Sequence, residues 1–167
     1  MSDVLIFAAS DNNNLKLSKA VGEIAKSKGY SSEVIDLSTL GLPLYTNATA
    51  KENDTPKAVL DIIAKMAATK AMAIFTPEYN GGLPPVLTNF IAWISRSDDK
   101  NWRQSFNGKK FIIGTHSGSG GLHALMALRT QLSYLGGVVM GRQIHTHFKK
   151  ELNPSSVEAI FDQINAL

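Results

Sequence analysis

Residues 71–94 read AMAIFTPEYNGGLPPVLTNFIAWI, and this stretch contains the pattern of one strand, one turn and one helix. Its first five residues form an apolar run of strand length. After Pro84 and Pro85, which are tolerated in the first turn of a helix, apolar residues recur at helical spacing as far as Ile94. The stretch therefore predicts a β-strand followed by a polar turn and an α-helix.

The same alternation extends outward to both ends of the chain. Apolar runs of strand length lie at residues 4–9, 32–37, 71–75, 110–115 and 138–140, and the last run resumes near Ile144. Further stripes of helical spacing are formed by Leu17, Val21, Ile24 and Ala25, by Val59, Ile62, Ile63 and Met66, by Leu122, Leu125, Met126, Leu132 and Leu135, and by Val157, Ile160, Phe161 and Ile164. This pattern predicts an α/β fold with a five-stranded parallel sheet and helices on both faces. Right-handed crossovers put the first, third and fourth strands in the middle, which gives the strand order 2-1-3-4-5.

Length and composition limit the classes of protein that fit. With 167 residues, 44% of them hydrophobic, the chain suits a single domain spanning residues 1–167. Its net charge of +3 comes from charges scattered along the sequence, which predicts no nucleic-acid partner. The apolar runs are too short for a secretory leader or a membrane span, so we expect a cytoplasmic protein with no membrane partner. Because the chain has no cysteine, any redox chemistry must come from a bound cofactor.

Polar loops follow the three central strands, and a doubly wound sheet binds its ligands at this edge. The first loop, residues 10–14, precedes a helix whose backbone N–H groups favour a phosphate. The alternative is an ordinary polar turn in which Ser10 or Asn14 caps the helix. Neither a Walker lysine nor a G-x-G-x-x-G pattern follows the first strand, which argues against a P-loop NTPase and a dinucleotide-binding Rossmann domain.

The second loop, residues 76–84, is the most informative because it combines rigid, aromatic, amide and glycine residues in one turn. Its proline fixes the exit from the strand, and its two glycines allow tight backbone geometry. Tyr79 and Asn80 are suited to stack on a flat heterocycle or to hydrogen-bond it. The loop therefore predicts a site for a planar ligand.

Four short motifs lie near the ends of the predicted elements. They are PEYNG at 77–81, with Leu83, Pro84 and a helix containing Asn89 and Trp93 after it, LPLY at 42–45, FNGK at 106–109, and THSGSGG at 115–121. Together they resemble the NADPH-dependent FMN reductase family of flavodoxin-like proteins. The resemblance implies a flavodoxin-like three-layer sandwich. It also implies an FMN enzyme, with NADPH or NADH as co-substrate, that passes hydride through flavin N5 to quinones, free flavin, azo compounds or similar small-molecule acceptors.

Carried onto this sequence, the resemblance implies two groups of FMN contacts. The phosphate loop corresponds to Ser10, Asn12, Asn14 and Leu15. The isoalloxazine ring is expected to lie against Pro77, Glu78, Tyr79, Asn80 and Gly81, largely through main-chain groups, and with its other edge against Ser117 and Gly118. The family usually has an arginine where Asn12 stands and a second serine near Asn14, so the resemblance predicts weaker FMN binding here. No side chain is expected to act as a general acid or base, because the flavin carries the chemistry.

The resemblance also implies a homodimer or homotetramer. Relatives pair through the helix after the PEYNG motif, so Phe90, Ile91 and Trp93 are expected either at a homodimer contact or in the core. His145 and His147 are spaced as metal ligands sometimes are, but two exposed polar positions at the end of a strand explain the pair better.

Two other functions remain open from the sequence. A flavodoxin-type electron carrier is one, although flavodoxins are usually acidic and this chain is basic. A family member that has drifted and no longer binds FMN is the other, because the usual arginine is missing. Four arginines are candidates for binding the 2′-phosphate of NADPH, on the sole ground that they lie near the predicted loops: Arg96, Arg103, Arg129 and Arg142.

Overall fold

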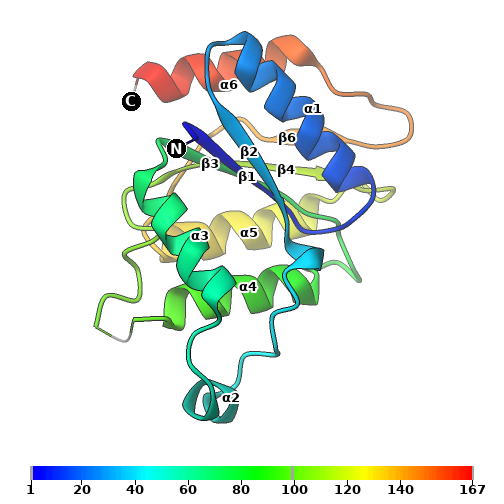
Figure 1. The fold of residues 1–167 in the computed structure, drawn as a ribbon. Coiled ribbons are helices and arrows are strands. Elements are labelled where there is room, and N and C mark those ends of the chain that lie inside the picture. The colour runs from blue at the N-terminus through cyan, green and yellow to red at the C-terminus, as the bar shows by residue number, and fades with distance from the viewer. Residues whose placement is uncertain (1, 99, 167) are drawn as a thin grey trace.

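The computed structural model, which describes residues 2–98 and 100–166, places a parallel sheet between two layers of helices (Figure 1). The strands are β1 (Val4–Ala8), β2 (Ser32–Asp36), β3 (Ala71–Phe75), β4 (Lys110–His116), β5 (Val138–Val139) and β6 (Ile144–Thr146). Their order is β2-β1-β3-β4-β5, with β6 also paired to β4, and all pairs are parallel. The predicted order 2-1-3-4-5 is therefore confirmed, with β1, β3 and β4 at the centre.

The last position of the sheet is shared by two short strands. β5 pairs with Lys110 and Phe111 at the start of β4, and β6 pairs with residues 114–116 at its end. Across the break, Arg129 donates hydrogen bonds to the carbonyls of Val139, Met140 and Gly141 at 2.9–3.4 Å. The predicted break in the last strand is confirmed. The guanidinium of Arg129 is hydrogen-bonded to main-chain carbonyls at this break.

Helices cover both faces of the sheet (Figure 1). They are α1 (Asn13–Ser27), α2 (Asn47–Glu52), α3 (Lys57–Ala68), α4 (Pro85–Arg96), α5 (Leu122–Tyr134) and α6 (Pro154–Ala166), with a 3₁₀ turn at Leu37–Thr39. One face packs against α1 and α6, and the other packs against α3, α4 and α5. The short helix α2 was not predicted, because it buries no side chain and so carries no apolar stripe. Its start is held instead by the Thr46 hydroxyl, which accepts from the N–H of Thr49 at 2.9 Å.

Helix α4 contributes its large apolar side chains to the chain's own core. Phe90, Ile91 and Trp93 are all buried, and the Phe90 ring lies 5.1 Å from that of Phe7 on β1. The indole N–H of Trp93 donates to the carbonyl of Pro43 at 2.7 Å, and Asn89 also binds this segment. Of the two alternatives for these three residues, the structure supports the core, because they are packed inside the chain.

The predicted stripe on α5 is partly wrong. Leu122 and Met126 were expected to face inward, but their side chains are 53% and 67% exposed. The buried positions are Ala124, Leu125, Leu128, Leu132 and Leu135. This set follows the period of the helix, whereas the prediction followed the largest apolar residues and overlooked a small alanine.

Candidate functional site

Asn14, at the start of α1, joins the loop after β1 to the loop after β4. Its side-chain amide donates to the carbonyl of His116 at 3.1 Å, and its side-chain oxygen accepts from the N–H of His116 at 2.7 Å. The side chain is buried, with only 2% of the residue exposed. Of the two roles predicted for Asn14, the N-cap is wrong, and only its main chain stays open for a phosphate.

The first turn of α1 presents unpaired donors. The N-cap residue is Asn12, not Ser10 or Asn14, and the Asn12 side chain makes no capping hydrogen bond. In the described part of the chain, the N–H groups of Asn13, Asn14 and Leu15 have no hydrogen-bond acceptor. The first turn also contains no acidic residue. Since the N-terminal end of a helix dipole is positive, this turn suits an anionic group.

The loop after β3 ends in a two-residue hairpin turn. Tyr79 and Gly82 exchange backbone hydrogen bonds of 3.0 and 2.9 Å. Between them Asn80 has a φ of 52° and Gly81 a φ of 73°, the positive values of a type I′ turn. Asn-Gly is the preferred pair for this turn, so the turn itself explains both residues. Tyr79 is about half exposed, and the N–H groups of Glu78, Asn80 and Gly81 have no acceptor among the described residues.

Glu78 caps the N-terminal end of helix α5, although it lies far from this helix in the sequence. Its carboxylate accepts from the hydroxyl of Ser119 at 2.8 Å and from the N–H of Ala124 at 3.1 Å, and the His123 ring lies 3.7 Å away. The N-cap residue of α5, Gly121, has no side chain to do this. These hydrogen bonds, led by that of Ser119, lower the pKa of Glu78 against the opposing effect of burial. Glu78 thus ties the loop after β3 to the loop after β4.

We expect the substitution Glu78→Gln to lower the free energy of unfolding by about 1 kcal/mol at neutral pH, because a charged acceptor binds more strongly than a neutral one. The folded-state pKa lies below the ordinary value of 4.5, so the carboxylate stabilises the fold above that pH. This stabilisation is lost as the pH falls through the folded-state pKa. Urea unfolding at neutral pH and near pH 3 measures both effects.

Glu52→Gln is the matched control, because Glu52 is exposed and makes no hydrogen bond with a described residue. We expect it to leave stability unchanged at neutral pH. An equal loss in both variants would show that the Glu78 cap is not the cause.

The loop after β4 supplies the other side of the site. The N–H of Ser117 donates to the carbonyl of Thr146 at 3.3 Å, and the Ser117 hydroxyl lies 3.1 Å from that of Ser119. The N–H of Gly118 has no acceptor within residues 2–98 and 100–166. Of the predicted pair, Gly118 therefore keeps a main-chain donor, while Ser117 has already used its own.

One aromatic residue at this edge was missed. Phe148 stands at the tip of a tight turn in which His147 and Lys150 exchange backbone hydrogen bonds of 3.0 and 2.9 Å. Its ring lies edge-on to His116, 5.5 Å between centroids, and covers Gly118. An aromatic residue between polar neighbours after the last strand was the signal in the sequence that pointed to it.

The paired histidines lie beside this turn. The rings of His145 and His147 are 5.5 Å apart, and both residues are partly buried rather than exposed as predicted. Burial, helped by nearby Lys150, lowers the pKa of His145. Within the described residues no three His, Asp or Glu side chains are grouped to hold a metal ion.

Three comparisons with known proteins bear on this site. The family model described as NADPH-dependent FMN reductase matches residues 2–151. The chain is 35% identical over 135 residues to a 2-hydroxy-1,4-benzoquinone reductase of Burkholderia sp, covering 79% of this chain and 69% of the relative. It is 34% identical over 152 residues to an NAD(P)H-dependent FMN reductase of Pseudomonas aeruginosa, covering 90% and 74%.

Solved structures agree in fold. A flavoenzyme NAD(P)H:(acceptor) oxidoreductase from Paracoccus denitrificans superposes with a TM-score of 0.79 at 24% identity, covering 99% of this chain and 98% of that one. A flavodoxin from Megasphaera elsdenii gives a TM-score of 0.66 at 16% identity, covering 95% and 98%. The match of the family model and the identity to curated relatives show that the chain belongs to the NADPH-dependent FMN reductase family.

Proposed function

We propose that this chain, an FMN-dependent NAD(P)H oxidoreductase by its family, passes hydride through FMN to quinones and similar small acceptors. One observation carries the proposal. Two buried side chains, Asn14 and Glu78, fasten the three strand-end loops to one another and leave main-chain donors of each loop unpaired. Such a preformed set of donors suits a cofactor bound mainly through backbone groups.

At the phosphate end, the proposed contacts are Ser10, Asn12, Leu15 and the main chain of Asn14. The unpaired N–H groups of the first turn of α1, and the absence of an acid from that turn, support this assignment. Asn12 brings no charge where relatives carry arginine, so the helix end must supply most of the attraction. FMN binding is therefore expected to be weaker than in relatives that keep the guanidinium.

At the ring end, the proposed contacts are the main chain of residues 77–81 and the N–H of Gly118, with Ser117 beside them. The type I′ turn fixes the directions of its N–H groups, and Glu78 holds the turn against α5. FMN held by these residues would supply the chemistry, which is hydride transfer through N5. These residues therefore bind and orient, and none of them is assigned a proton-transfer step.

A quinone is the proposed class of acceptor. The Burkholderia relative is named as a 2-hydroxy-1,4-benzoquinone reductase, and Tyr79 offers an exposed aromatic surface beside the proposed ring site. The electron-carrier alternative is not favoured, because the family model and the curated relatives are reductases.

The proposal extends to a single cytoplasmic domain over residues 1–167 that forms a homodimer or homotetramer. The two core clusters lie on opposite faces of one sheet, which supports one domain. Exposed apolar side chains on α5, among them Leu122 and Met126, support self-association. None of the helices in the described part of the chain is long and apolar enough to span a membrane.

The deciding experiment is a titration of purified apoprotein with FMN, followed by oxidation of NADPH and NADH with a quinone. We expect saturable quenching of flavin fluorescence with one FMN per chain, and turnover that requires both FMN and quinone. Binding without turnover would indicate a carrier. No binding at micromolar FMN would overturn the proposed function.

A further inference from the structure

A large cavity lies next to the proposed flavin site, and the proposed FMN contacts do not use it. It is open to solvent and has a volume of about 620 Å³ between α1 and residues 146–152. Its walls include Lys16, Leu17 and Ala20 from one side of α1, His116 from β4, and Phe148 and Leu152. This volume falls within the range of small-molecule sites, and the lining is largely apolar with a charged rim, as in such sites.

Phe148 connects this cavity to the flavin site. A methyl group built on Gly118 would lie 3.4 Å from the Phe148 ring, so the ring covers the loop proposed to hold the flavin edge. The same ring lines the cavity, and it is 81% exposed. A phenylalanine left in water forgoes the gain of burying its ring, which makes the ring available to stack on a ligand.

Charge at the cavity suits an anionic group near the start of α1. Lys16 is exposed and forms no ion pair with a described residue. It stands in the first turn of α1, whose unpaired N–H groups are proposed above for the FMN phosphate, so the charge at the cavity comes from side chains. Glu151 is the acid on the lining, across the cavity from α1.

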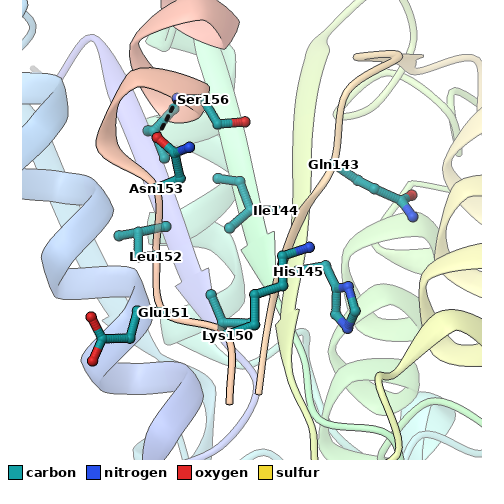
Figure 2. A pocket seen from close by; sticks show the side chains of 10 residues that line it. Gln143, Ile144, His145, Lys150, Glu151, Leu152, Asn153 and Ser156 are labelled. Atoms are coloured by element: carbon teal, nitrogen blue, oxygen red, sulfur yellow. Dashed lines mark hydrogen bonds between the residues drawn. The ribbon is translucent and has the colours of Figure 1, made fainter. Parts of the chain in front are cut away.

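A smaller pocket on the other side of residues 150–153 is a weaker candidate. It holds about 70 Å³, which leaves room for an ion but not for a nucleotide. In Figure 2 the Lys150 side chain extends toward His145, whereas Glu151 points away to the opposite side. Lys150 also lines the large cavity, so two cationic side chains, Lys16 and Lys150, lie at its rim.

We propose that the large cavity binds the adenosine diphosphate end of NAD(P)H while the nicotinamide lies at the flavin. This inference rests on the proposed function. Phe148 stacks on the adenine, and the ammonium groups of Lys16 and Lys150 attract the diphosphate. A nucleotide suits this site better than a single-ring quinone, because the site combines an exposed aromatic ring with two cationic side chains in a volume of about 620 Å³.

Binding of ADP alone tests the site without turnover. By isothermal titration of the FMN-loaded protein, we expect Phe148→Ala to raise the Kd of ADP about tenfold, the usual scale for loss of one stacked base. Lys16→Met keeps the aliphatic stem, and we expect it to raise the Kd about threefold to fivefold, more at low salt than at high salt. Leu60→Ala and Lys19→Met are matched controls, because both residues are exposed and lie outside the cavity lining.

Steady-state kinetics then identify the half of the cofactor that is recognised. The KM for NADPH should rise by the same factors in Phe148→Ala and Lys16→Met. The KM for reduced nicotinamide mononucleotide, which lacks the adenosine, should stay within twofold.

Three results would overturn the inference. They are an unchanged Kd for ADP, an equal rise in KM for the mononucleotide, and a loss of FMN affinity that accounts for the whole effect. If the wild-type protein oxidises no reduced nicotinamide, the proposed function fails, while the ADP titration still reports on the cavity by itself.

Discussion

Replacing Gly114 by alanine is expected to lower the free energy of unfolding by about 3 kcal/mol. A Cβ built on this residue of β4 would lie 2.5 Å from a ring carbon of Phe75 and 3.0 Å from the Cβ of Ile144. Phe75 is fully buried on the neighbouring strand, so its ring has nowhere to move without displacing the core around it. Overpacking of this kind costs about 1–3 kcal/mol, and a contact so short on a central strand belongs at the upper end. Urea unfolding followed by circular dichroism measures the loss.

Gly141→Ala is the matched control. A Cβ built on Gly141 meets no atom within 4 Å, and the residue does not have a positive φ. We expect its stability to stay within about 0.5 kcal/mol of the wild type. In a Gly114→Ala background, Phe75→Leu should cost less than it does alone, because the smaller side chain relieves the contact. Additive losses would show that the two side chains do not collide.

Replacing Asn14 by leucine is expected to cost about 2–3 kcal/mol of stability and to weaken FMN binding at least tenfold. Leucine has the same branched arrangement of side-chain heavy atoms as asparagine but cannot form hydrogen bonds, so the N–H and the carbonyl of His116 both lose their partner. Buried polar groups left unpaired cost about 1–3 kcal/mol each. The loop after β1 would then no longer be fastened to the loop after β4. FMN binding would have to order the loop after β1, which lowers the affinity.

The neighbouring substitution Asn12→Leu isolates this effect on stability. The Asn12 side chain is exposed and makes no capping hydrogen bond, so we expect a change of about 0.5 kcal/mol or less. Thermal unfolding of both variants without FMN gives the stability term, and fluorescence titration gives the affinity. A stable Asn14→Leu protein with normal FMN affinity would contradict the role given to this side chain.

Parts of the fold were readable from the sequence because they depend on local pattern. β3 begins and ends where predicted, since its apolar run is bounded by Lys70 and by a polar loop. The face of α5 was misjudged because the prediction followed large apolar residues such as Met126, which is exposed, and overlooked the small Ala124, which is buried. For Trp93 the sequence cannot distinguish the core from an interface, because both are apolar surroundings.

At the candidate site, the sequence identified the loops but not the work of their side chains. Asn14 meets His116, which is 102 residues away, and Glu78 meets Ala124, which is 46 residues away. The local sequence pattern does not predict such distant pairs. A residue that fastens two loops therefore cannot be distinguished in the sequence from one that contacts a ligand. The tight turn at Gly81 was the exception, because its geometry is local and was predicted from the glycines, although the sequence assigned Asn80 to a ligand rather than to the turn.

The divided strand at the edge of the sheet affects how readily the protein aggregates at high concentration. An outer strand normally offers a row of unpaired backbone groups on which a strand of another molecule can grow. Here that row is broken into segments of two and three residues, with the Arg129 side chain holding the carbonyls between them. An incoming strand therefore finds no continuous ladder to extend, and this margin of the molecule resists edge-to-edge aggregation.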